Sequence, residues 1–161
     1  MFQCLLEDNI NTLQNDLKEL EPKDRIKARL IDLVSYASDA GFYYLRPKAV
    51  VLPVSDEEIK MLFKFADQYQ IPLTFRAAGT SLSGQSISDG ILVDLSQHWN
   101  FVRVEEKGET VRVHPGVIGA VVNSELKKYG KKSLFSGVER NCKASRIWLY
   151  IIINFIFIIK N

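Results

Sequence analysis

The loop FRAAGTSLSGQ, at positions 75–85, holds the residues of this chain best suited to bind a ligand. Its alanines and glycines have no bulky side chains that would block the backbone, so that successive N–H groups can converge on an anion. Its hydroxyl side chains add further donors, and its arginine offers a cation at the entrance or pairs with a carboxylate of the sheet. We therefore predict a phosphate-binding loop, with a plain surface turn as the alternative. The candidate residues are Arg76, Ala77, Ala78, Gly79, Thr80, Ser81, Leu82, Ser83, Gly84 and Gln85.

Two common phosphate-binding motifs do not describe this loop. Gly79 and Gly84 have the spacing of a P-loop, but Gln85 stands where that motif requires a lysine. A P-loop also opens directly into a helix, whereas Asp89 and Gly90 form a turn that leads into an apolar strand. The dinucleotide fingerprint GxGxxG is absent. What remains is a nest of backbone N–H groups between two strands, which suits a diphosphate bound without magnesium.

Two amphipathic helices are predicted at the start of the chain. The first ends at Pro22, and the second follows Asp24. Both carry apolar residues at spacings of three and four. Those of the first helix are Ile10, Leu13, Leu17 and Leu20, and those of the second are Ile26, Leu30, Leu33 and Val34. Residues 36–44 are expected to be irregular.

A β-α-β unit is predicted over residues 49–75, immediately before the loop. The apolar run 49–52 indicates a buried strand, and Leu73–Phe75 indicates a second one. Between them, Ser55 and Glu58 have the spacing of a capping box that opens a helix ending near residue 70. The two strands would be parallel, with a right-handed crossover. The residues expected on the inward face of this helix are Ile59, Leu62, Phe63 and Ala66.

A strand, a hairpin and a helix are predicted after the loop. The strand is predicted over residues 91–93. Residues 101–105 and 110–114 alternate apolar and charged side chains, which is typical of a hairpin with one solvent-exposed face. The final helix runs from about residue 117 to 129 and ends at Gly130. Its inward residues are predicted to be Val121, Val122 and Leu126. The predicted fold class is α+β with a mixed sheet.

Composition limits the kinds of partner and site. The chain has 161 residues, 21 basic and 19 acidic, and a net charge of +2, which argues against nucleic acid or a membrane surface as a partner. Cys4 and Cys142 form no CxxC pair, which favours a reducing, cytoplasmic location. His98 and His114 stand alone, so that we expect them to be structural and expect no metal site.

The order of these segments resembles a known flavoprotein domain. IPLTFRAAGTSLSGQS, GILVDLS and VRVHPGV are similar to the FAD-binding (PCMH-type) domain of the vanillyl-alcohol oxidase / p-cresol methylhydroxylase family, and most of all to its glycolate oxidase / D-lactate dehydrogenase branch. The resemblance covers residues 34–132. It implies that the loop from Arg76 to Gly84 cradles the FAD pyrophosphate and that Pro115 and Gly116 approach the flavin. Thr80 stands where some members attach FAD through a histidine, so that the resemblance implies non-covalent FAD.

The resemblance divides the chain into three parts. These are a helical segment over 1–35, a partial FAD-binding domain over 36–132 and an apolar tail over 133–161. The family pattern stops after Lys132, so that the resemblance implies that the second FAD subdomain and the cap are missing. Residues 147–161 are rich in amino acids with A/T-rich codons, which favours a frameshifted or truncated reading frame. A buried strand or helix and a membrane anchor are the alternatives for this tail.

The function implied by the resemblance is oxidation of a 2-hydroxy acid, such as D-lactate or glycolate, by an FAD-dependent oxidoreductase. The chain would supply the FAD-binding part and be inactive alone, and a second chain could complete the flavin site. We find no general base and no carboxylate-binding arginine in the sequence, so that no catalytic residue is assigned. The alternative is a small non-catalytic protein that binds a nucleotide or is anchored to a membrane.

Overall fold

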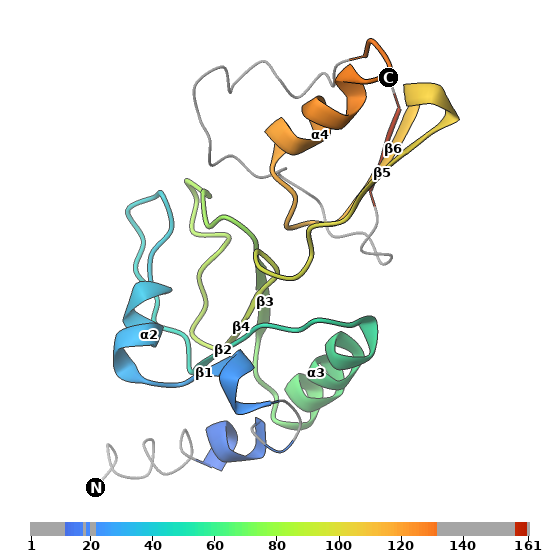
Figure 1. Cartoon of the computed structure of the whole chain (residues 1–161). Helices are drawn as coiled ribbons and strands as arrows, with labels where there is room; N and C mark the ends of the chain where they lie inside the picture. The colour runs from blue at the N-terminus through green and yellow to red at the C-terminus, as the bar shows by residue number, and fades with distance from the viewer. Residues whose placement is uncertain (1–11, 18, 20–21, 132–156, 161) are drawn as a thin grey trace, which may run out of the picture. The chain divides into compact units, whose positions relative to one another are not determined.

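The computed structural model describes residues 12–17, 19, 22–131 and 157–160 (Figure 1). The chain divides into two compact units, Met1–Asp94 and Leu95–Asn161, and each unit has its own β-sheet. The predicted α+β class is therefore confirmed.

The first unit begins with helix and an edge strand. Residues 12–17 are helical, with Leu13 and Leu17 buried as predicted, whereas positions 10 and 20 lie outside the described side chains. The 3-10 helix η1 (Lys23–Arg25), strand β1 (Ile26–Lys27) and helix α2 (Leu30–Ser35) follow.

The prediction that Ile26 lies on the apolar face of the second helix is wrong. Ile26 lies in β1, where it pairs antiparallel with Val51. Pairing with this neighbouring strand outweighs the local helical period, and α2 begins only after Arg29. Of the apolar residues predicted to face inward in α2, Leu33 is buried, but Leu30 is 62% exposed and Val34 is 42% exposed.

The sheet of the first unit has the strand order β1-β2-β4-β3. Strands β2 (Ala49–Val51) and β3 (Leu73–Arg76) both run parallel to β4 (Ile91–Asp94), which lies between them. The predicted parallel direction is confirmed, but β2 and β3 are not neighbours. Every residue of β2 and β4 is buried, as is typical of strands covered on both faces. Figure 1 shows α2 and α3 on either side of these strands.

Helix α3 (Asp56–Gln68) begins where the capping box predicts. The Ser55 Oγ accepts a hydrogen bond of 3.3 Å from the Glu58 N–H, as that motif requires. The Glu58 carboxylate reaches back to the start of the helix, where the backbone N–H of Ser55 is among the donors that lower its pKa. It accepts the Val54 N–H at 2.7 Å and pairs with the Arg25 guanidinium at 2.6 Å.

One predicted inward position of α3 is wrong. Phe63 is 49% exposed, whereas Phe65 is buried together with Ile59, Leu62 and Ala66. Phe63 instead lies at the edge of the helix face, with its ring 5.7 Å from that of Phe75 on β3.

In its described residues, the second unit is a three-stranded antiparallel sheet with one α-helix. Strand β5 (Val102–Glu105), the 3-10 turn η2 (Glu106–Gly108) and strand β6 (Thr110–Val113) form the predicted hairpin, and α4 (Gly119–Lys127) follows. Strand β7 (Phe157–Lys160) pairs with β6. The rest of the predicted apolar tail, residues 133–156 and 161, lies outside the described residues.

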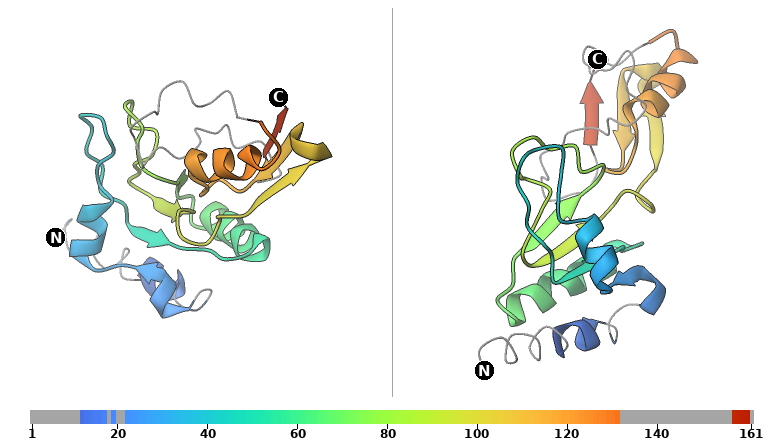
Figure 2. Two further views of the ribbon diagram at one scale, coloured as in Figure 1. Left: turned by 45° about the horizontal axis from the view of Figure 1, so that its top comes forward. Right: turned by 90° about the vertical axis from the view of Figure 1, so that its left-hand side faces the viewer.

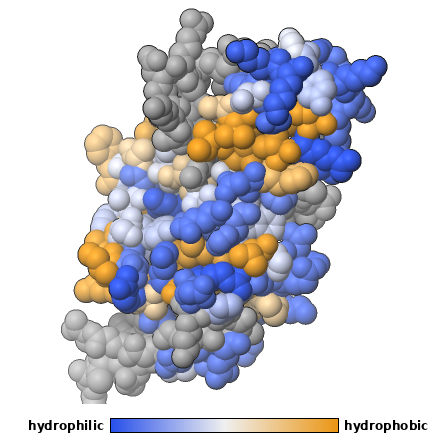
Figure 3. All heavy atoms as spheres, in the orientation of Figure 1, coloured by the Kyte–Doolittle hydropathy of each residue, from blue (hydrophilic) through white to orange (hydrophobic). Residues whose placement is uncertain are grey.

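The core of the second unit joins α4 to the hairpin. Val122 and Leu126 are buried as predicted, but Val121 is 46% exposed, because it is next to Val122 and points away from the hairpin side of the helix. Figure 3 shows hydrophobic side chains gathered at this end of the chain. The buried cluster consists of Val111, Val113, Val117, Val122 and Leu126.

Candidate functional site

The predicted phosphate loop connects β3 to β4, two neighbouring parallel strands. Gly79 and Gly84 have φ values of +68° and +72°, a backbone conformation that L side chains rarely adopt. A side chain at Gly79 would also overlap Arg76, because an added Cβ would lie 2.3 Å from the arginine Nη2. The loop therefore requires glycine at position 79 both for its conformation and for its packing.

Ser81 organises the middle of the loop. Its side chain is buried, and its Oγ accepts the backbone N–H groups of Ser83 at 3.2 Å and Gln85 at 3.1 Å. This arrangement curls residues 81–85 around one hydroxyl oxygen. The Ser81 hydroxyl, predicted from the sequence as a ligand donor, thus also acts as an acceptor within the loop.

Arg76, at the end of β3, contacts backbone on both sides of the loop. Its Nη1 donates to the carbonyl oxygens of Tyr36 at 3.2 Å, Ser38 at 2.9 Å and Ser86 at 3.3 Å. Its guanidinium carbon lies 5.3 Å from the centre of the Tyr36 ring. The sequence predicts a cation at the entrance or a partner for a carboxylate, and these carbonyl contacts are neither.

The segment 36–44, for which the sequence predicts no regular structure, packs against the phosphate loop. The Ala40 N–H donates to the Ser81 carbonyl at 3.0 Å, and Gly41 packs so closely that an added Cβ would lie 2.7 Å from the Leu82 carbonyl oxygen. An added Cβ at Gly84 would lie 3.2 Å from the Tyr43 ring. Figures 1 and 2 show this segment and the β3–β4 loop projecting side by side from the sheet.

Several polar groups of the loop remain available to a ligand. Within the described residues, the backbone N–H groups of Ala78, Gly79 and Thr80 donate no hydrogen bond. The Ser86 Oγ is buried and has no hydrogen-bond partner there. Bare N–H groups in a glycine-containing turn fit the oxygens of a phosphate.

Tyr36 and Asp94 form a polar pair under the loop. The Tyr36 hydroxyl donates to the Asp94 Oδ2 at 2.7 Å, and Asp94 is only 4% exposed at the end of β4. Burial, with help from this hydrogen bond, raises the pKa of the Tyr36 hydroxyl well above its usual range. No pattern in the sequence indicates this pair, because the two residues are 58 positions apart.

The other two predicted site residues, Pro115 and Gly116, belong to the second unit. Both are buried in a turn after β6, where the Gly116 N–H donates to the Trp99 carbonyl at 2.8 Å. A side chain at Gly116 could not fit, since its Cβ would lie 2.3 Å from the Leu95 carbonyl oxygen. The His114 ring is tilted against Trp99, with the ring centres 5.1 Å apart, which suits the structural role predicted for it.

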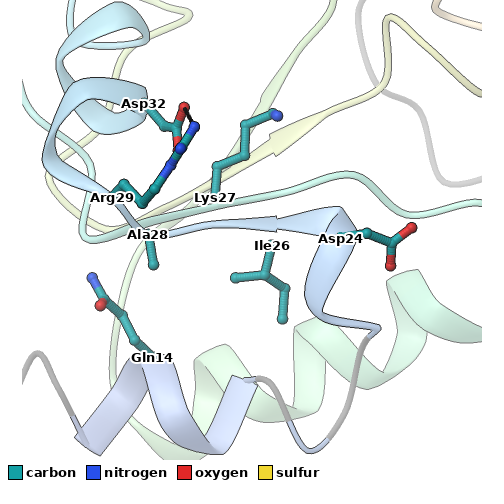
Figure 4. Close-up of a pocket in the computed structure, with 7 residues that line it drawn as sticks. All are labelled: Gln14, Asp24, Ile26, Lys27, Ala28, Arg29 and Asp32. Carbon is teal, nitrogen blue, oxygen red and sulfur yellow. Dashed lines mark hydrogen bonds and ion pairs between the residues drawn. The ribbon is translucent and has the colours of Figure 1, made fainter.

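A separate hollow lies in the first unit among residues 14–32 (Figure 4). It has a volume of about 470 Å³ and contains none of the predicted site residues. Arg29 and Asp32 at its wall pair with each other, at 2.7 and 3.0 Å, and this contact lowers the pKa of Asp32. The residues that line it are Gln14, Asp24, Ile26, Lys27, Ala28, Arg29 and Asp32.

Metal ligands and membrane spans are both lacking in the part of the chain that the structure describes. No group of three or more His, Cys, Asp or Glu side chains there could hold a metal ion. No helix there is long and apolar enough to cross a membrane.

This chain is similar to known flavoproteins both in sequence and in fold. A family model described as "FAD binding domain" matches residues 47–140. D-2-hydroxyglutarate dehydrogenase of Escherichia coli (strain K12) is 31% identical over 128 residues, which are 75% of this chain and 13% of that protein. Glycolate oxidase subunit GlcD of Bacillus subtilis (strain 168) is 33% identical over 78 residues, which are 47% of this chain and 17% of that protein.

Solved flavoprotein structures share the fold. The structure of p-cresol methylhydroxylase with substrate bound superposes with a TM-score of 0.63 at 17% identity, over 74% of this chain and 25% of that one. The 4-ethylphenol oxidase from Gulosibacter chungangensis gives a TM-score of 0.66 at 20% identity, over 76% and 25%. The PCMH-type fold that the resemblance implies is thereby confirmed, and the chain spans about an eighth of the length of the D-2-hydroxyglutarate dehydrogenase that it matches.

Proposed function

Because this chain belongs to the family described as the FAD binding domain, we propose that its β3–β4 loop holds the pyrophosphate of FAD. The observation that carries the proposal is the set of N–H groups at Ala78, Gly79 and Thr80, which donate to no other group among the described residues. Such groups, held by a turn at Gly79 with a φ of +68°, offer a diphosphate donors that need little reorganisation on binding.

The other residues of the loop have distinct roles in this proposal. Ser81 fixes the curl of residues 81–85, and Ala77 keeps the approach to the N–H groups free of side-chain bulk. The outer half of the loop consists of Leu82, Ser83, Gly84 and Gln85. Pro115 and Gly116 form a buried turn in the second unit, and the role proposed for them, an approach to the flavin, is the one that the family likeness implies.

We propose non-covalent attachment of FAD because Thr80 offers no nucleophilic nitrogen where some family members have a histidine. Denaturing the FAD-loaded protein in acid should release all of its flavin into the supernatant. Flavin fluorescence that stays with the precipitated polypeptide would contradict this part of the proposal.

We propose that the assembled enzyme oxidises a 2-hydroxy acid to the corresponding 2-oxo acid. Relatives named D-2-hydroxyglutarate dehydrogenase and glycolate oxidase subunit GlcD support this substrate class. Bound FAD would supply the two-electron acceptor that such an oxidation needs. The residues of this chain would bind and orient the cofactor, while a further polypeptide region or a second chain would hold the substrate. The assembled enzyme would be located in the cytoplasm.

Titration of the purified chain with FAD, ADP and riboflavin tests the proposal. FAD and ADP share the diphosphate and riboflavin lacks it, so that we expect binding of the first two to exceed that of riboflavin. Ser81→Ala removes the acceptor of two N–H bonds, each worth about 1 kcal/mol, and should weaken FAD by roughly tenfold or more.

Ser124→Ala is the matched control, because Ser124 is an exposed serine on α4. It should bind FAD as the wild type does. Equal affinity for FAD and riboflavin, or an unchanged FAD affinity in Ser81→Ala, would show that the loop does not hold the diphosphate.

A further inference from the structure

We infer that Arg76 is a positioning residue: its guanidinium shapes the phosphate loop from inside and does not serve as the cation that meets the phosphate. This inference deepens the proposed function and rests on it for the identity of the ligand. It concerns a residue whose charge and place at the start of the loop favour the opposite role, that of a direct anion ligand.

The hydrogen bonds of Arg76 join three separate pieces of chain. Its Nη1 lies 3.2 Å from the Tyr36 carbonyl oxygen, 2.9 Å from that of Ser38 and 3.3 Å from that of Ser86. One nitrogen has two hydrogens, so that the three carbonyls share them. The positive charge is thus set against the negative ends of three backbone dipoles, which it connects across the base of the loop.

Other parts of the guanidinium also contact protein. The Tyr36 ring lies 5.3 Å from the guanidinium carbon. Gly79 packs against the other atoms of the group, since a Cβ there would lie 2.3 Å from Nη2 and 2.5 Å from both Nε and Cζ. The turn at Gly79, which carries ligand-facing N–H groups in our proposal, therefore rests on this side chain.

The support continues into a backbone contact that can be measured. The Ala40 N–H donates to the Ser81 carbonyl at 3.0 Å, and this bond ties the 36–44 segment to the loop. Arg76 holds that segment at Tyr36 and Ser38, a few residues away. Without the guanidinium, the segment and the loop should separate more often, and the Ala40 amide should exchange faster.

The experiment is amide hydrogen exchange on the cofactor-free full chain, for wild type, Arg76→Met and the control Arg103→Met. Arg103 has a 68% exposed side chain that is 3.6 Å from Glu105, so that its replacement makes the same chemical change without touching the loop. We expect exchange of Ala40 to rise about tenfold in Arg76→Met and to stay unchanged in Arg103→Met. A direct phosphate ligand would leave the cofactor-free exchange at Ala40 at the wild-type rate, and that result would overturn the inference.

A second readout is the salt dependence of FAD affinity. A direct charge–phosphate contact is screened by salt, so that its loss would matter at low ionic strength and little at high ionic strength. A positioning role predicts that Arg76→Met weakens FAD by about the same factor, roughly tenfold, from low to high salt. A difference from wild type that disappears at high salt would overturn the inference.

A milder variant keeps the test decisive if Arg76→Met does not fold. Arg76→Lys retains the charge but loses the planar fork that spans the three carbonyls. It should still raise exchange at Ala40, and wild-type exchange in this variant would contradict the positioning role. Because the exchange measurement uses no cofactor, it remains valid even if the wild-type chain fails to bind FAD, which would refute the proposed function alone.

Discussion

Replacing Gly79 by alanine should weaken FAD binding far more than the same change at Gly130. The two glycines have φ values of +68° and +69°, so that both substitutions incur the same left-handed backbone strain. They differ in their surroundings. A Cβ at position 79 would overlap the Arg76 guanidinium, whereas a Cβ at position 130 would meet no atom of the described residues within 4 Å. Gly130→Ala is therefore a matched control for the strain.

The size of the difference follows from the contacts of Arg76. A left-handed alanine costs about 1–2 kcal/mol at either position. At position 79 the guanidinium must also move, which breaks the contacts of its Nη1 with three carbonyls, where two hydrogens make hydrogen bonds worth about 1 kcal/mol each. An excess of about 2 kcal/mol in forming the binding-competent loop corresponds to roughly thirtyfold weaker FAD binding.

Fluorescence titration with FAD measures this difference directly. We expect roughly thirtyfold weaker binding for Gly79→Ala and wild-type binding for Gly130→Ala, which lies just after α4. In the Arg76→Ala background the overlap is gone, so that the additional effect of Gly79→Ala should shrink to that of strain alone. Equal affinities of the two alanine variants, or full additivity with Arg76→Ala, would refute the packing argument.

Two pH-dependent predictions follow from the ionisable groups of the first unit. Burial alone would raise the pKa of Glu58, but its hydrogen bonds from Arg25 and a backbone N–H outweigh burial and lower it. The Glu58 carboxylate thus stabilises the fold above the ordinary pKa of 4.5, and this contribution is lost as the pH falls through the lower folded pKa. Glu58→Gln should cost about 1 kcal/mol at neutral pH and remove this acid dependence in urea unfolding, whereas Glu57→Gln, on the exposed face, should not. The raised pKa of Tyr36 gives stability that is complete below pH 10.0 and is lost as the pH rises through the folded pKa, so that Tyr36→Phe, which removes the bond to Asp94, should flatten the fall of Tm at alkaline pH. A Tyr36→Phe profile parallel to that of wild type would contradict this reasoning.

Local signals in the sequence predicted the elements but not their partners. Ser55 and Glu58 predicted the start of α3, because a capping box involves residues only three positions apart. Ile26 fits a helical period, yet it pairs with Val51, a residue distant in sequence that decides its conformation. The position of β4 between β2 and β3 is likewise a tertiary property, which no period within the strands reveals.

In the candidate site, too, features carried by neighbouring residues were predicted, whereas contacts between distant segments were not. The small residues and hydroxyls of the loop predicted a phosphate nest, and their order along the chain indicated the FAD-binding family that the family match confirms. The partners of Arg76 could not be predicted, because backbone carbonyls at Tyr36 and Ser38 carry no side-chain signature. The ion pair of Glu58 with Arg25 could not be predicted for a similar reason: it depends on how distant chain segments are brought together.

The central position of β4 has a consequence for how the protein is made. On the ribosome, β2 and β3 are synthesised before β4, which is the strand that pairs with both of them. Until Asp94 has left the exit tunnel, β2 and β3 each expose an unpaired edge, which is prone to associate with other chains. The loop between β3 and β4 joins a strand that is synthesised earlier to one that is synthesised later. The nascent chain therefore forms its phosphate-binding loop only after β4 has paired with β3, and chaperones have the most unpaired strand edge to protect before that pairing.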